Sequence, residues 1–162
     1  MVSPEIFVLR MGAFSPLAGS TNEMKVQIGA HSIVIEDDVL FAHVNNPWQL
    51  DEMRQFLALC EKTYARLGSV YLVTLVGPGY NLPPESRRYI AEWGRNHVVS
   101  GNVIVGAPFA MRALITVLSR AAKLFGGRSS EVEFTATESE ARRWVAQRKA
   151  QRAASGTAHP SV

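Results

Sequence analysis

The side chains best placed for binding chemistry follow three predicted strands, where each strand gives way to a helix. These turns span residues 45–48, 77–84 and 106–108. In open parallel sheets the turns after the carboxyl ends of the strands lie along one edge, and ligands bind there. Polar or aromatic side chains on these turns, and at the helix starts beside them, could line a site: Asn46, Trp48, Tyr80, Asn81, Arg87, Arg88 and Arg112.

Three of these side chains are arginines near helix starts, where a positive charge opposes the helix dipole. One interpretation is that Arg87, Arg88 and Arg112 bind an anionic ligand through its carboxylate or phosphate group. The other is that they pair with Glu85, Glu92 or carboxylates along the edge, or point into water. The sequence does not separate the two interpretations.

Motifs that mark catalysis, metal binding or phosphate binding are absent from the chain. Gly77 and Gly79 flank Pro78, which lacks the amide that could hold a phosphate, and no Walker loop or serine elbow occurs. None of the four histidines lies three or four residues from another, as a local histidine metal site requires. Cys60, the single cysteine, falls on an apolar helix stripe and is expected in the core. We therefore expect no catalytic residue, no metal, no cofactor and no enzyme activity.

Apolar periodicity predicts the elements that must position these side chains. Runs of β-branched and aromatic residues predict strands at 31–36, 39–44, 70–76, 103–105 and 131–135. Steps of three and four predict helices over 50–67, from residue 84, over about 109–125, and after a capping box of Thr137 and Glu140. Three consecutive crossovers require parallel strands. We expect a single α/β domain with four helices and a mainly parallel sheet of about five strands, opened by an antiparallel hairpin.

The ends of the chain lack this regularity. We expect residues 1–24 to be an N-terminal extension, either disordered or with a short strand at 6–9, residues 25–150 to form the domain, and residues 151–162 to be a flexible C-terminal tail. No apolar run approaches the ~20 residues that span a bilayer. The first residues lack the basic start of a secretory signal, so we expect a cytoplasmic protein.

The third predicted helix carries more apolar residues than one core stripe needs. A stripe facing the sheet would contain Leu114, Val117, Leu118, Ala121 and Leu124. The wider apolar face, with Arg112, Arg120 and Lys123 beside it, would also suit a membrane surface, a protein partner or a second copy of the chain. Packing against the sheet is the simpler expectation, and dimerisation through the surplus apolar face is compatible with it.

The order of elements and several short segments resemble the STAS fold, and within it the bacterial SpoIIAA-like or STAS/SEC14-like proteins. The segments are residues 70–73 leading into 83–88, Arg112 after residues 106–108, and residues 134–135 with 138–144. The resemblance as a whole covers about 120 of the 162 residues. The resemblance implies a small bacterial module that regulates by binding and has no catalytic activity.

The resemblance also implies a candidate modification site and a class of ligand. In the sporulation members of this family, a serine at the start of the second helix is phosphorylated, and the matching hydroxyl here is Ser86. The flanking Asp and Gly of that motif are absent, so Ser86 is either phosphorylated or an ordinary solvated serine. The SEC14-like side of the family implies a lipid or other apolar ligand between the third helix and the sheet.

The basic character of the chain belongs to its C-terminal end. The net charge is +3 and the isoelectric point is near 9.3. Residues 141–162 contain five cations and no acid, so the rest of the chain is net negative by two. We interpret these cations as a solvated helix end that suits the C-terminal dipole, and expect no nucleic-acid binding.

These observations favour a non-enzymatic module that binds a protein partner or a second copy of itself. The alternative is a binder of a small apolar, lipid or anionic ligand at the strand-end edge.

Overall fold

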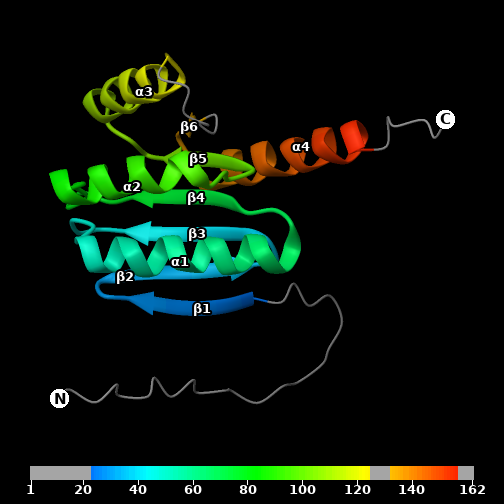
Figure 1. Cartoon of the computed structure of the whole chain (residues 1–162), viewed down its shortest axis with the longest axis horizontal. Helices are drawn as coiled ribbons and strands as arrows, with labels where there is room; N and C mark the ends of the chain where they lie inside the picture. Colours follow the sequence, from blue (N-terminus) through cyan, green and yellow to red (C-terminus); the bar gives the residue numbers. More distant parts are fainter. Residues whose placement is uncertain (1–22, 125–131, 157–162) are drawn as a thin grey trace.

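The computed structural model describes residues 23–124 and 132–156. Within them the chain forms a six-stranded sheet and four helices, in the order shown in Figure 1. The strands are β1 (Glu23–Ile28), β2 (His31–Glu36), β3 (Val39–Val44), β4 (Tyr71–Val76), β5 (Gly101–Val105) and β6 (Val132–Thr135). The helices are α1 (Leu50–Leu67), α2 (Pro84–Asn96), α3 (Phe109–Leu124) and α4 (Glu138–Gly156).

The strands lie side by side in chain order, from β1 at one edge to β6 at the other. β1, β2 and β3 are antiparallel, and β3, β4, β5 and β6 are parallel. The prediction of an α/β domain with a hairpin, parallel strands and four helices is therefore confirmed. β1 is an additional strand that the sequence analysis did not predict, because only Ile28 among its side chains is buried.

Helices cover both faces of the sheet, and each face has its own hydrophobic core. Successive side chains of a strand point to opposite faces, so one strand contributes to both cores. On β3, Leu40 and Val44 face the core beneath α1 and α2, whereas Phe41 belongs to the core beneath α4. Ala141 and Val145 of α4 complete that second core. Because the central strands are buried on both sides, their sequences read as continuous apolar runs.

The helix α1 shows how local sequence fixes an element. Gln49 and Glu52 form a capping box at its start, and Gly68 ends it with φ of 72°, a left-handed conformation that favours glycine. Phe56 and Cys60 lie on its buried stripe. Cys60 is thus a core residue, as predicted.

The helix α3 differs from the other three because its apolar residues are exposed. It packs against the edge strand β6 and stands away from the rest of the sheet (Figure 1). Phe109, Leu114 and Val117 are 86%, 46% and 64% exposed. The expectation that Leu114 and Val117 face the sheet is therefore wrong. The other predicted stripe residues, Leu118, Ala121 and Leu124, lie outside the side chains that the structure describes.

The ends of the domain differ from the predicted boundaries. Residues 1–22 of the predicted extension lie outside the described residues, and Glu23 and Met24 already belong to β1. At the other end α4 continues to Gly156, beyond the boundary predicted at residue 150, and residues 157–162 lie outside the described part. No helix within the described ranges is long and apolar enough to cross a membrane.

Candidate functional site

The turns after β3 and β4 pack directly against each other. The amide of Trp48 donates to the carbonyl of Asn81 at 3.0 Å, and the amide of Gly77 donates to the carbonyl of Val44 at 2.8 Å. A Cβ atom on Gly79 would lie 2.1 Å from the backbone carbonyl oxygen of Asn45, so glycine is required there. Backbone hydrogen bonds and close backbone contacts therefore join these two turns at the edge where a ligand was predicted.

Two of the predicted lining residues on these turns, Trp48 and Tyr80, pack in or against the hydrophobic core beneath α1 and α2. Trp48 is buried and stacks on the His31 ring, with 4.1 Å between the ring centroids. Tyr80 packs against the same core, and burial raises the pKa of its hydroxyl. Asn46 and Asn81 are exposed, and Oδ1 of Asn81 accepts the amide hydrogen of Leu82.

The three predicted arginines lie near the starts of two helices, α2 and α3. Arg87 and Arg88 are exposed on α2, and neither side chain pairs with any residue that the structure describes. Arg112 lies at the start of α3, where Nε donates to the carbonyl of Ala107 at 2.8 Å and the guanidinium lies 6.0 Å from the Phe134 ring. The predicted anion site is thus spread over two separate helices.

Ser86 is fully buried, with its hydroxyl donating to the carbonyl of Trp48 at 2.7 Å. It is not the solvated serine that one interpretation required. Phosphorylation would need this hydrogen bond to break and the start of α2 to leave the β3–α1 turn.

A buried pair that the sequence analysis missed lies beside Trp48. His31 is fully buried, its Nε2 lies 3.1 Å from Oε2 of Glu52, and the same oxygen accepts the amide hydrogen of Gln49. Nδ1 of His31 has no hydrogen-bond partner among the described residues. The His31 ring is closed off from solvent and the Glu52 side chain is 20% exposed, and their contact joins β2 to the first turn of α1. Its members are 21 residues apart, and no local spacing signals the contact.

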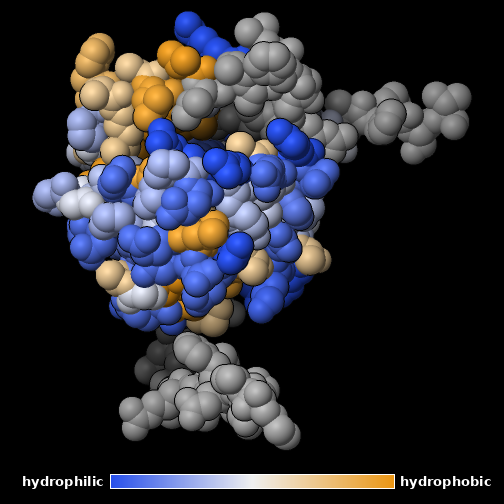
Figure 2. Space-filling model, turned by 60° about the vertical axis from the view of Figure 1, so that its left-hand side comes forward, coloured by the Kyte–Doolittle hydropathy of each residue, from blue (hydrophilic) through white to orange (hydrophobic). Residues whose placement is uncertain are grey.

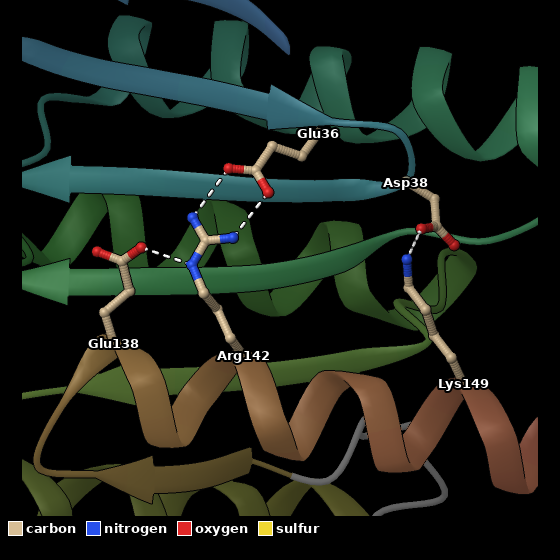
Figure 3. Close-up of polar contacts among 5 residues, drawn as sticks. All are labelled: Glu36, Asp38, Glu138, Arg142 and Lys149. Atoms are coloured by element: carbon tan, nitrogen blue, oxygen red, sulfur yellow. Dashed lines mark hydrogen bonds and ion pairs between the residues drawn. The ribbon is translucent and has the colours of Figure 1, made fainter. Parts of the chain in front are cut away.

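The cations of α4 bind acids of the β2–β3 hairpin (Figure 3). Arg142 makes two hydrogen bonds to Glu36, at 2.7 and 2.8 Å, and a third to Glu138 at 2.8 Å. Lys149 pairs with Asp38. Arg152, beyond the predicted domain end, donates to Oγ of Ser100 at 2.7 Å. Interpreting these cations as a solvated helix end is therefore wrong for these three residues.

These pairs shift the pKa values of both acids downward. The hydrogen bonds from Arg142 are the main cause for Glu36. Burial acts to raise the pKa of Asp38, but the hydrogen bonds from Lys149 and Ser69 outweigh it. Arg142 also lies 4.0 Å from the centroid of the Phe41 ring, so the pairing anchors α4 to the sheet.

Three of the exposed large apolar side chains, Phe109, Leu114 and Val117, lie together on α3. Figure 2 shows hydrophobic residues gathered over this helix, above a surface that is mainly hydrophilic. On a helix with 3.6 residues per turn, Phe109, Ala113 and Val117 form one row, and Ala110 and Leu114 form the row beside it. We call these five residues the α3 apolar face. All five are exposed.

The described residues hold no group of three His, Cys, Asp or Glu side chains that could bind a metal ion. Comparisons with protein-family models, with curated proteins and with solved structures found no match to this chain. The resemblance to the STAS family therefore stays a prediction.

Proposed function

We propose that this protein is a STAS-like bacterial module that acts by binding and not by catalysis, and that it associates with a second copy of itself through the α3 apolar face. The observation that carries the proposal is the exposure of that face, with Phe109 at 86% and Val117 at 64%. Contiguous apolar surface on a folded protein marks an interaction site.

The chemistry of α3 favours a second copy as the occupant. Ala110 and Ala113 lie among Phe109, Leu114 and Val117, so two such helices can approach closely and interlock large side chains with small ones. A twofold pair places the same surface on both subunits, which a self-complementary stripe satisfies. In an antiparallel pair centred near Leu114, Arg120 of each copy faces Phe109 of the other, a cation–π arrangement.

Sedimentation velocity over a range of concentrations tests this proposal. The variant Leu114→Gln/Val117→Gln removes apolar surface from α3 without adding charge. We expect it to weaken self-association about tenfold or more relative to the wild type, since central apolar side chains carry much of the affinity of an interface.

A matched control changes two equally exposed apolar residues elsewhere. Met24 and Leu67 are each 45% exposed, close to the 46% of Leu114, and neither lies on α3. The variant Met24→Gln/Leu67→Gln should associate as the wild type does. A wild-type protein that stays monomeric while co-sedimenting with anionic vesicles would instead assign the α3 apolar face to a membrane surface.

A further inference from the structure

A cleft of about 250 Å³ lies between the C-terminal halves of α1 and α2, away from α3 and from the strand-end turns. The buried side chains Cys60 and Val70 form its inner surface. Tyr64 of α1 and Trp93 of α2 line it with aromatic rings. Its remaining side chains include one carboxylate, that of Glu61, and the imidazole of His97.

Hydrogen bonds hold the polar side of the cleft in place. Nε1 of Trp93 donates to Oε1 of Glu61 at 2.6 Å, and Nε2 of His97 lies 3.5 Å from the same oxygen. The rings of Trp93 and His97 stack with 4.5 Å between centroids and 7° between planes, and Nδ1 of His97 donates to the Trp93 carbonyl at 2.9 Å. Oε2 of Glu61 has no hydrogen-bond partner among the described residues and can accept one from a ligand.

The charge of the cleft selects the ligand class. No lysine or arginine is among the residues that line it, and Glu61 supplies a negative charge. Burial raises the pKa of the Cys60 thiol to about 12, so the inner surface is uncharged at neutral pH. A carboxylate beside aromatic rings disfavours anions and attracts organic cations, which gain both from the opposite charge and from the rings.

We propose that the cleft between α1 and α2 binds a small organic cation with an alkylated ammonium group, which Glu61, Tyr64 and Trp93 recognise. The volume lies below the roughly 300–1,000 Å³ of sites for drug-sized ligands, so it suits a compact head group. This site is independent of self-association through α3.

The indole N–H of Trp93 reports directly on the site, because it donates to the carboxylate that would hold the ligand. Choline is the probe, titrated at constant pH and ionic strength. The chain has three tryptophans, so a ¹H–¹⁵N spectrum contains three indole signals to assign. We expect a saturable shift of the Trp93 signal alone, with a dissociation constant on the order of 1 mM.

Charge recognition is tested with a neutral molecule of the same shape, 3,3-dimethylbutan-1-ol. We expect it to bind roughly five- to thirtyfold more weakly than choline, from the summed strengths of a cation–π contact and an exposed ion pair. The variant Glu61→Gln keeps an oxygen that accepts from Trp93 and loses only the ion pair, so choline should bind it about two- to fivefold more weakly. The matched control is Glu92→Gln, on the same helix as Trp93 but outside the cleft, and it should bind choline unchanged.

Three results would overturn the proposal: equal affinity for choline and its neutral analogue, unchanged choline affinity in Glu61→Gln, or the lack of any saturable shift confined to Trp93. Where choline binds as expected, phosphatidylcholine vesicles identify the source of the cation. Co-sedimentation that Glu61→Gln weakens assigns it to a lipid head group, and its absence assigns it to a free small molecule.

Discussion

Ser86 and Trp48 tie the β3–α1 turn to the start of α2 from two sides. The Ser86 hydroxyl donates to the carbonyl of Trp48, while the amide of Trp48 donates to the carbonyl of Asn81. The indole itself stacks on His31. Ser86 and Trp48 are both buried and both have partners. Serine and tryptophan side chains can take part in binding or catalysis, but here they stabilise the junction between β2, the β3–α1 turn and the start of α2.

Replacing Ser86 should therefore affect stability. Ser86→Ala leaves the Trp48 carbonyl without its buried donor and should lower the free energy of unfolding by about 1–3 kcal/mol. Ser86→Asp, which mimics a phosphate, places an unpaired charge in the core and should cost about 3 kcal/mol or more. Urea unfolding followed by tryptophan fluorescence measures both changes.

Ser139 provides the control, because it also lies in the first turn of a helix but is exposed. Ser139→Asp should change the free energy of unfolding by no more than about 0.5 kcal/mol. A Ser86→Asp protein as stable as the wild type would show that the start of α2 tolerates a negative charge, and would return phosphorylation of Ser86 to consideration.

At the scale of elements, α1 and α3 have similar apolar periodicity but differ in how far their apolar side chains are exposed. Phe56 and Cys60 of α1 are buried against the sheet, whereas Leu114 and Val117 of α3 are exposed. Periodicity predicts that a helix has an apolar face, but not whether a surface is left for it to cover. Here α1 and α2 cover one face of the sheet and Ala141 of α4 lies in the core of the other. Apart from β1, the type and order of the elements were thus predictable, whereas the exposure of Leu114 and Val117 was not.

The helix α4 should depend on cations that lie near its C-terminal end. Lys149 pairs with Asp38, whose side chain is only 15% exposed, and Arg152 donates to Ser100 and to the Gly68 carbonyl. We expect Lys149→Ala to lower the free energy of unfolding by about 1–2 kcal/mol, because it removes a donor from the partly buried carboxylate of Asp38. We expect Arg152→Ala to lower it by about 0.5–1 kcal/mol, because both hydrogen bonds of Arg152 are exposed to solvent. Chemical denaturation of the two variants measures this.

Arg143 is the matched control on the same helix. Its side chain is exposed, and Arg143→Ala should change stability by at most about 0.5 kcal/mol. If all three variants lose equal stability, the loss reflects general changes in α4 and not the contacts of Lys149 and Arg152.

At the scale of the whole molecule, ion pairs bind α4 to the β2–β3 hairpin. Arg142 and Glu36 are 106 residues apart, and Lys149 and Asp38 are 111 residues apart. The sequence locates the cations at one end of the chain, but their pairing with Glu36 and Asp38 depends on how α4 crosses the sheet. The same reason explains why the cleft at Glu61, Trp93 and His97 was not predicted, since two helices must meet to form it.

This pairing should make stability depend on acid pH. The pKa values of Glu36 and Asp38 are lowered from ordinary values of 4.5 and 3.8. A carboxyl group whose pKa is lower in the folded chain stabilises the fold above its unfolded pKa, and this stability is lost as the pH falls through the folded pKa. The free energy of unfolding should thus be steady near neutral pH and decline as the pH falls below about 4.5. Arg142→Gln removes the main cause of the Glu36 shift and should make this decline shallower in urea titrations, as should Glu36→Gln. Acid slopes equal to that of the wild type in both variants would show that the contact between α4 and the hairpin does not govern acid stability.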